Sequence, residues 1–409
     1  MKKLVYGLFD VANSPFQVLI ISLIFSAYFA NHVVGDPKLG SSYWQWTVGA
    51  CALLVALIGI YLGQCSDQVK KGRRKIFIAT TLLCIVTTLF LWKVEPNPTN
   101  IIYCLTIFFI ANFFFELSQM FYNSYLFNFS EKKNTGYISG LSFALGFIGI
   151  LPLVLFLLNS FILPDNTLFN LDKTKFEHIR IVPVLVACWF FIFSIPIFKD
   201  VYNAKPRKIV KKRSKSTFDM VYKKNKLTNI GKYLIARLFY ADAIIAMQTA
   251  SGIFAVQTYG LTLAEIFKVY FFTSFSAAAG SVIGGYYNDK VGSKNVIIVC
   301  IFFLVLTVLA MSIGQTKIHF FIAMAFGVFF FGAIQSASRV LMTRFLKSDN
   351  LGQGFGLFTL ASRSTAIMGP IMVGTITYFT NLRIGFASII ILLLIGLFVL
   401  NKVKVPKNY

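Results

Sequence analysis

The sequence predicts an all-α integral membrane protein with twelve transmembrane helices in two similar six-helix halves. Three observations support this fold class. The 409-residue chain is 57% hydrophobic and only 13% charged, whereas soluble proteins carry about 25% charged residues. Its apolar segments are each about as long as a lipid bilayer requires. Related motifs also recur in the two halves at nearly constant offsets.

The expected spans follow one another with short connections. They are 8–31, 44–64, 76–92, 101–127, 137–158 and 179–198 in the first half, then 230–259, 264–287, 296–313, 318–341, 355–379 and 384–400. The long exception among the connections is 199–231, which is rich in Lys and Arg. The sequence therefore predicts an N-terminal bundle at 1–198, a basic cytoplasmic linker at 199–231 and a C-terminal bundle at 232–409.

The distribution of cations predicts the orientation. Lys and Arg total 39 against 15 Asp and Glu, giving a formal net charge of +24. If the N-terminus is inside, most of these cations fall in cytoplasmic segments, which places both termini in the cytoplasm. This placement accounts for the charge without a nucleic-acid partner. The run 205–226 fits either a contact with anionic membrane lipid or a solvated linker that enforces topology.

Two basic turns repeat at matched places in the halves, at 63–75 and 285–294. Each has a glycine, an aspartate four residues later (Asp67 or Asp289), and then a glycine beside cations. Glycine lets helix ends approach closely, and a carboxylate stabilises a helix N-terminus. Such turns resemble the loop between helices 2 and 3 of the major facilitator superfamily. We expect Asp67 to face the start of span 355–379, near Gly354 and Gly356, and to hold the cytoplasmic side closed.

Several short strings carry a narrower resemblance. They lie at 9–14, 122–126, 139–146, 338–339, 356–358, 362–364 and 369–370. Together they resemble the vacuole-effluxer family of this superfamily, whose fungal members export amino acids from the vacuole and which has many bacterial relatives. Two departures stand out. Gly72 follows Asp67 by five residues, where the wider superfamily has three, and 352–355 reads Gly-Gln-Gly-Phe where the family often has an acidic residue and paired aromatics.

The resemblance implies the major facilitator fold, in which two pseudo-symmetric bundles alternate access to a central site. It implies that span 44–64 meets span 355–379, and that span 137–158 meets span 264–287. Small residues at helical spacing suit such close packing: Gly59 and Gly63, Ser142 and Gly146, and Ser276, Gly280 and Gly284. Because the family has many bacterial relatives, we expect this protein to lie in the inner membrane of a bacterium.

Ionisable side chains inside the spans carry the chemistry, because charges in lipid are costly. They are Asp10, Glu116, Asp242, Arg237, Arg339 and Arg363. Polar stripes at helical spacing accompany them: Asn112, Glu116, Gln119 and Asn123; Asp10, Asn13, Ser14 and Gln17; Gln335 and Arg339. Asp10, Arg237 and Arg339 lie near cytoplasmic ends, so with Glu116, Asp242, Asp67 and Asp289 they are expected to form a gate or coupling set. Permanent interhelical pairing is the alternative.

Arg363 lies close to mid-membrane and is the best single candidate for a ligand contact. It stands between Ser362 and Ser364, with Thr359 one turn below and a bend expected at Gly369-Pro370. Its partner is either the carboxylate or phosphate of a substrate or Asp242. The wider substrate-binding set comprises Arg363, Gln17, Asn13, Gln119, Asn123, Gln335 and Thr359.

Glu116 is the expected carrier of a coupling proton, with Asp10 second. Phenylalanines occupy the three preceding positions, and desolvation by such neighbours favours the protonated acid. A nearby arginine would oppose that effect.

Other classes of protein fit poorly. The six cysteines are scattered singly among apolar residues, without metal-ligand spacing. His32, His178 and His319 fall near outer helix ends, where surface residues are expected rather than proton relays. We find no nucleophile constellation, metal cluster or phosphate loop, and so expect neither an enzyme nor a cofactor.

The function predicted from the sequence is secondary active transport of a small polar metabolite, an amino acid or other carboxylate-bearing solute, by a monomer. A lipid or drug exporter is one alternative. Another is a membrane receptor or scaffold without transport activity, which would use the 199–231 linker as its partner site.

Overall fold

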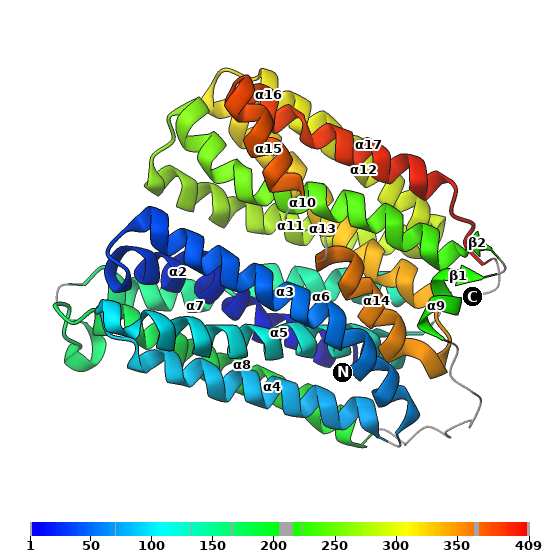
Figure 1. Ribbon diagram of the computed structural model, residues 1–409, viewed down its shortest axis with the longest axis horizontal. Helices are drawn as coiled ribbons and strands as arrows, with labels where there is room; N and C mark the ends of the chain where they lie inside the picture. The colour runs from blue at the N-terminus through cyan, green and yellow to red at the C-terminus, as the bar shows by residue number, and fades with distance from the viewer. Residues whose placement is uncertain are drawn as a thin grey trace. The chain divides into compact units, whose positions relative to one another are not determined.

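The computed structural model describes residues 2–69, 71–131, 133–164, 167–203, 216–223, 225–363 and 368–406 (Figure 1). Within these described residues, each of the twelve predicted spans is mainly helical. Nine described helical segments are long and apolar enough to cross a membrane; the remaining spans are α10 (Asn229–Tyr259), α11 (Leu263–Val291) and the pair α14 (Leu351–Arg363) and α15 (Met368–Phe379). The all-α membrane fold class is confirmed.

The first half holds six spans. The first consists of α1 (Lys2–Pro15), η1 (Phe16–Leu23), α2 (Ile24–Tyr28) and η2 (Phe29–Val33). Then come α3 (Pro37–Gln68), α4 (Gly72–Phe90) with η3 (Leu91–Lys93), and α5 (Ile101–Phe129) after η4 (Pro98–Asn100). The last are α6 (Thr135–Gly149), α7 (Leu151–Leu157) and η5 (Leu158–Ile162), then η6 (Leu168–Asn170) and α8 (Glu177–Asn203).

The second half begins with elements that the sequence analysis did not foresee. A short helix, α9 (Thr217–Val221), leads into strands β1 (Tyr222–Lys223) and β2 (Lys226–Leu227), which pair antiparallel with Tyr222 opposite Leu227. After α10 and α11 follow α12 (Ser293–Ile313), α13 (Lys317–Phe345), η7 (Ser348–Asn350), α14 and α15. The chain closes with α16 (Leu382–Ala387) and α17 (Ile389–Asn401).

Side-chain caps set several helix starts. Asp36 accepts hydrogen bonds from the amides of Lys38 and Leu39, with Pro37 at the first helical position of α3. Thr262 and Glu265 form a reciprocal capping box on α11. Thr228 and Thr316 cap α10 and α13. These side chains satisfy amides that have no partner within the helix.

The first span departs from a regular α-helix. Pro15 lies inside it, and η1 and η2 are π-helical segments. Because proline lacks an N–H, the α-helical ladder is interrupted there. The helical spacing assumed for the stripe of Asp10, Asn13 and Gln17 therefore fails after Pro15: Asp10 and Asn13 are buried, whereas Gln17 is exposed.

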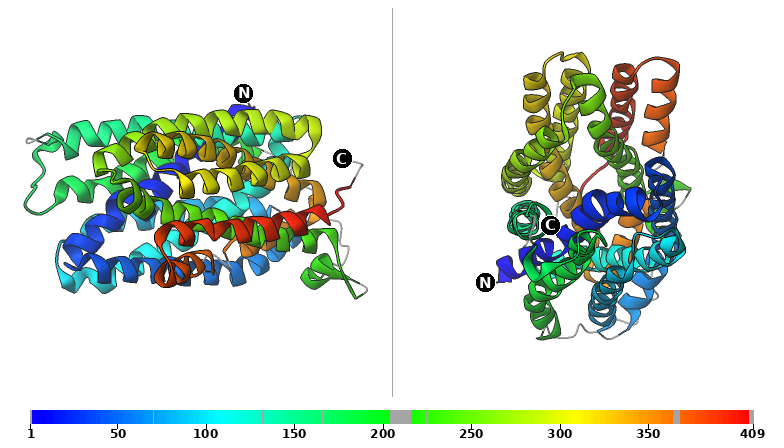
Figure 2. Two further views of the ribbon diagram at one scale, coloured as in Figure 1. Left: turned by 90° about the horizontal axis from the view of Figure 1, so that it is seen from above. Right: turned by 90° about the vertical axis from the view of Figure 1, so that its left-hand side faces the viewer.

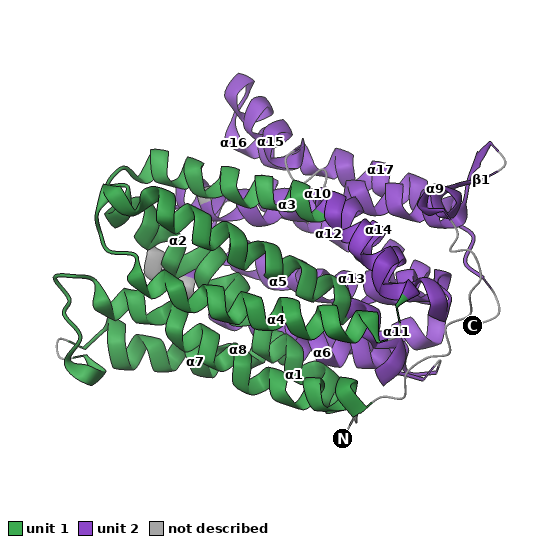
Figure 3. Cartoon of the chain, turned by 60° about the horizontal axis from the view of Figure 1, so that its bottom comes forward, with its two compact units in different colours: residues 1–55, 69–122, 145–208 green, residues 56–68, 123–144, 209–409 purple. Residues whose placement is uncertain are grey.

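The described residues form two compact units, coloured in Figure 3. Unit 1 comprises 1–55, 69–122 and 145–208, and unit 2 comprises 56–68, 123–144 and 209–409. Within each unit the long helices run side by side (Figure 2). Unit 2 thus contains the end of α3 and the α5–α6 turn together with the second half of the chain.

Aromatic packing and glycine contacts form the cores of the two units. In unit 1 Trp44 stacks on Phe108 with ring centroids 3.7 Å apart, and Phe16 stacks on Phe115 at 4.6 Å. In unit 2 Gly280 and Gly284 of α11 lie against Phe329 and Ala333 of α13. Many large apolar side chains remain exposed on the helices, as expected for faces that contact lipid.

Candidate functional site

Asp67, in the last turn of α3, binds the start of α14. Its carboxylate oxygens accept hydrogen bonds from the backbone amides of Gly352, at 3.2 Å, and Gln353, at 3.0 Å. These are the second and third residues of α14, whose amides have no acceptor within the helix. The predicted contact with this helix is confirmed, but it lies two residues before Gly354, because the helix begins at Leu351 rather than Phe355.

Asp289, in the last turn of α11, makes the equivalent contact with α6. Its two oxygens accept hydrogen bonds from the amides of Gly136, at 2.7 Å, and Tyr137, at 2.8 Å. These are again the second and third residues of a helix. Each carboxylate therefore joins the end of one helix to the positive end of another.

Glycines allow the backbones to approach at both contacts. A Cβ placed on Gly352 would lie 2.7 Å from the carbonyl oxygen of Gly63, and one on Gly285 would lie 2.6 Å from that of Gly136. Gly140 likewise packs against the carbonyl group of Ser281. The end of α3 thus meets α14, and the start of α6 meets α11, as the superfamily resemblance implied.

Arg339 ties α13 to the α5–α6 region. Its guanidinium donates to the hydroxyl and carbonyl oxygens of Ser139 and to the hydroxyl of Ser142, each at 3.0 Å, and to the side-chain oxygen of Asn123 at 3.3 Å. It also lies over the ring of Phe143, 4.3 Å from the centroid. The side chain is only 2% exposed, so these bonds replace its hydration.

Arg237 lies beside an aromatic cluster in unit 2. Its guanidinium carbon is 3.6 Å from the centroid of Phe358, and it donates a long bond, 3.5 Å, to the hydroxyl of Tyr240. That hydroxyl is 2.8 Å from the hydroxyl of Ser338, next to Arg339 in the chain. The two predicted gate arginines are thus linked through α13.

Asp10 belongs to a hydrogen-bonded network in unit 1. The Tyr122 hydroxyl donates to its carboxylate and to the Tyr6 carbonyl, both at 2.9 Å. Asn13 donates to the other carboxylate oxygen at 3.4 Å, and the Ser14 hydroxyl donates to the Asp10 carbonyl at 2.6 Å. The Asp10 side chain is therefore held by hydrogen bonds from α5 and from its own helix.

Asp242 differs from Asp10. It is 2% exposed, and one of its carboxylate oxygens has no hydrogen-bond partner. Within the described residues no ion pair joins it to Arg363, which was one alternative for that arginine.

The remaining candidates are spread over several helices. Glu116 and Thr359 are buried, and Gln119, Gln335 and Arg363 are half-buried. Ser364 lies outside the described residues. His32 and His319 are exposed as predicted, but His178 is half-buried. Among the described residues no group of His, Cys, Asp and Glu side chains could hold a metal ion.

A family model described as "Vacuole effluxer Atg22 like" matches residues 128–409, more than half of the chain. The chain belongs to this family. The resemblance inferred from the short sequence strings is therefore confirmed.

Similarity to transporters extends along the whole of this chain. An uncharacterized MFS-type transporter of Bacillus subtilis, YxiO, is 21% identical over 404 residues, covering 96% of this chain and 92% of its own. A proton-coupled antiporter flippase of Staphylococcus aureus, LtaA, is 25% identical over 224 residues, 53% of each chain. The solved structure of the proton:xylose symporter XylE superposes with a TM-score of 0.76 at 13% identity, covering 99% and 95% of the two chains. The protein is a transporter of the major facilitator kind.

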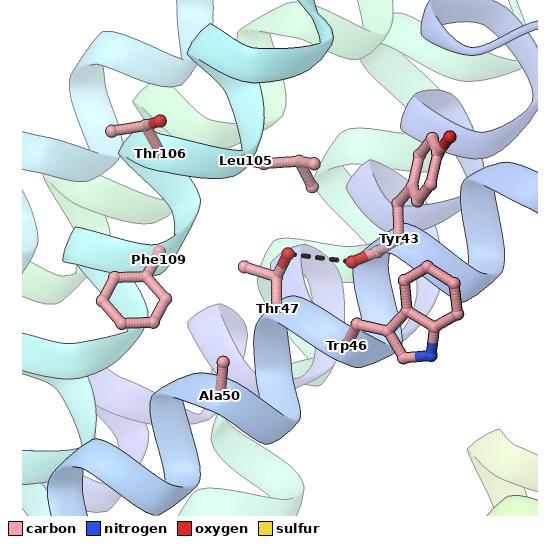
Figure 4. A pocket seen from close by; sticks show the side chains of 7 residues that line it. All are labelled: Tyr43, Trp46, Thr47, Ala50, Leu105, Thr106 and Phe109. Carbon is pink, nitrogen blue, oxygen red and sulfur yellow. Dashed lines mark hydrogen bonds between the residues drawn. The ribbon is translucent and has the colours of Figure 1, made fainter.

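An open groove of about 420 Å³ lies between α3 and α5 of unit 1 (Figure 4). Its lining is mainly apolar and aromatic: Tyr43, Trp46, Thr47, Ala50, Leu105, Thr106 and Phe109. It lies toward the ends of these helices that are remote from Asp67 and Asn123. The sequence analysis did not predict it.

Sequence reasoning also missed several functional partners. Ser139 and Tyr122 lie in strings that were noted only for their family resemblance, yet they bind Arg339 and Asp10. Thr217 accepts a hydrogen bond of 2.7 Å from the side-chain amide of Gln353. A signal for Ser139 existed, since it lies one turn from Ser142 and Phe143 on a helix rich in small residues.

Proposed function

We propose that this protein is a secondary active transporter that moves a small polar metabolite, an amino acid or another carboxylate-bearing solute, by alternating access. The observation that carries the proposal is the matched pair of contacts in unit 2, where Asp67 and Asp289 each bind a helix start from the opposite half of the chain. Hydrogen bonds to helix ends can break and reform when water replaces them.

In the proposed cycle the bundles 1–198 and 232–409 rock about the substrate, joined by the linker 199–231. Closure on the cytoplasmic side forms the Asp67 and Asp289 contacts. Arg339 adds to this gate, because it holds Ser139 and Asn123 of the first bundle against α13. Arg237 and Asp10 act at the same end. We place the protein in a bacterial inner membrane with both termini in the cytoplasm.

Arg363 is the proposed anchor for the substrate's carboxylate. Arg363 is the last described residue of α14. Its planar guanidinium offers two parallel donors to an anion. The proposed substrate-binding set also comprises Gln17, Asn13, Gln119, Asn123, Gln335 and Thr359.

The test is counterflow of a labelled solute library into proteoliposomes, followed by binding of the transported solute to Arg363→Lys protein. Loss of the two-donor face should weaken affinity about tenfold or more. Arg383→Lys is the matched control, because Arg383 donates to the carbonyls of Ser312 and Gly314 at another site. Wild-type affinity in Arg363→Lys would assign Arg363 to helix packing and remove the case for an anionic substrate.

Glu116 is the proposed proton carrier, with Asp10 second. Glu116→Gln should abolish acceleration of transport by a pH gradient while leaving substrate-for-substrate exchange. If wild-type transport ignores an imposed pH gradient, neither carboxylate has this role.

Export of a lipid or another amphiphile is the second candidate. The apolar groove of Figure 4 supports it, as does the similarity to the flippase LtaA. Fluorescent lipids in proteoliposomes distinguish the two: lipid movement that depends on Trp46, without counterflow of polar solutes, would favour this candidate.

A further inference from the structure

Asp242 is a buried carboxyl whose surroundings leave it half satisfied. It lies near the middle of α10 and is 2% exposed. One oxygen has no hydrogen-bond partner, while the backbone amide of Gly369, at the start of α15, donates to the carboxylate. A buried acid of this kind suggests a ligand that the amino-acid side chains do not supply.

The cations nearby do not neutralise it. On α10 itself Arg237 lies five residues away, roughly 140° around the helix, and packs over Phe358. The charged and titratable groups on elements packed against α10 are Lys317, His319, Arg339 and Arg344 on α13, Arg363 on α14, Tyr378 on α15, Arg383 on α16, Asp219 on α9 and Lys226 on β2. In the part of the chain that the structure describes, none of them forms an ion pair with Asp242.

The space around the carboxyl limits what can bind. A Cβ placed on Gly369 would lie 2.9 Å from the Asp242 carbonyl oxygen, 2.9 Å from Cβ of Ala246 and 3.3 Å from the carboxyl carbon. On the side that faces Gly369, a solute or a hydrated metal ion therefore has no room beside Asp242. A proton needs none.

The charge balance points the same way. An ionised carboxylate buried without a cation costs several kcal/mol. The Gly369 amide offsets part of this cost, but it leaves the second oxygen unsatisfied. Taking up one proton removes the charge altogether.

We propose that Asp242 is a second proton site, in addition to Glu116, and that it is protonated while α15 packs on α10. When α15 moves away during transport, water reaches the carboxyl, which gives its proton to that water and becomes a carboxylate. This coupling step rests on the proposed transport function, whereas protonation of Asp242 in the packed state does not.

Infrared titration of the purified full-length protein tests the site without a substrate. At neutral pH wild type should show the C=O stretching band of a carboxylic acid, and the band should shift when aspartate carries ¹³C at the carboxyl carbon. Asp242→Asn should lack this band. Asp36→Asn is the control and should keep it, because Asp36 is an exposed residue that caps the start of α3. A protonated Glu116 would also give an acid band, but that band would not shift, because only aspartate carries the label.

Asp242→Glu covers the case in which the asparagine variant fails to fold. It should keep an acid band that no longer shifts with ¹³C-aspartate. Absence of the aspartate-sensitive band in wild type, or its survival in Asp242→Asn or Asp242→Glu, would overturn the proposal. These outcomes leave the transporter assignment intact, and failure of solute transport would leave the infrared result intact.

Discussion

The two carboxylate contacts of unit 2 have the same geometry but different support. Asp289 holds the amides of α6 at 2.7 and 2.8 Å, whereas Asp67 holds those of α14 at 3.2 and 3.0 Å. Shorter charge-assisted bonds are stronger. The Asp67 contact has an additional support. Its partner Gln353, which Asp67 binds through the backbone amide, also donates a side-chain hydrogen bond to Thr217 in the 199–231 linker. The looser contact is therefore joined to the linker side, whereas the tighter one has Arg344 beside it, bound to the carbonyl of Asn288.

Cys65 can report on both contacts. It is half-exposed and lies two residues before Asp67, whereas Cys188 is exposed and the other four cysteines are buried. In a Cys188→Ser background, a membrane-impermeant maleimide applied to inside-out vesicles should therefore modify mainly Cys65. Opening of the cytoplasmic gate should raise the labelling rate.

The largest effect is expected from the glycine that packs closely against the facing helix at each of the two contacts. Gly63→Ala and Gly140→Ala each place a methyl group against a carbonyl of the facing helix, so the gate cannot close. Transport should fall by more than about tenfold and Cys65 labelling should rise. Gly374→Ala is the control, because a Cβ there meets nothing within 4 Å. Normal transport by either gate variant would mean that these backbones do not need to approach this closely.

Arg339→Lys should come next. A lysine keeps the charge but cannot reach Ser139, Ser142 and Asn123 together. Losing two charge-assisted bonds should cost the closed gate about 2–3 kcal/mol, or roughly 30- to 150-fold in its equilibrium. The measurement is Cys65 labelling alongside transport, with Arg383→Lys as control, because Arg383 binds the carbonyls of Ser312 and Gly314 away from the gate. If Arg339→Lys labels at the wild-type rate, Arg339 does not stabilise closure.

Substitutions of the two aspartates compare the strengths of the two contacts directly. Asp289→Asn should shift the gate by about 2 kcal/mol and Asp67→Asn by about 1 kcal/mol, because the Asp289 bonds are shorter. Both variants should fold, slow transport and label faster at Cys65. A larger effect at Asp67 than at Asp289 would show that bond length does not rank these contacts.

The sequence predicted most of this architecture. Apolar segment length located the spans, and the first Gly and Asp turn located the contact of Asp67. The contact of Asp289 with α6 was not predicted. The start of α14 was misplaced because Gly352 and Gly354 look like loop residues, yet close packing on Gly63 requires glycine inside this helix. Gln17 is exposed while Asp10 and Asn13 are buried, because π-helical turns follow Pro15. The bonds from Arg339 to Ser139 depend on tertiary packing between segments 200 residues apart, which no local pattern encodes.

The smallest expected effect tests whether the linker tunes the looser contact. Thr217→Val removes the acceptor of the Gln353 side chain while keeping the shape of the residue. Its effect on closure should be about 0.5–1 kcal/mol, a two- to fivefold change in Cys65 labelling.

A double-mutant cycle decides the origin of that effect. Gln353 joins Thr217 through its side chain and Asp67 through its backbone amide, so Thr217→Val should lose much of its effect in an Asp67→Asn background. In an Asp289→Asn background the two effects should add, since Asp289 shares no partner with Thr217. Additivity in both backgrounds would mean that Thr217 only anchors the linker. Coupling to Asp67 alone would make the linker a selective brace on one of two otherwise equivalent gate contacts.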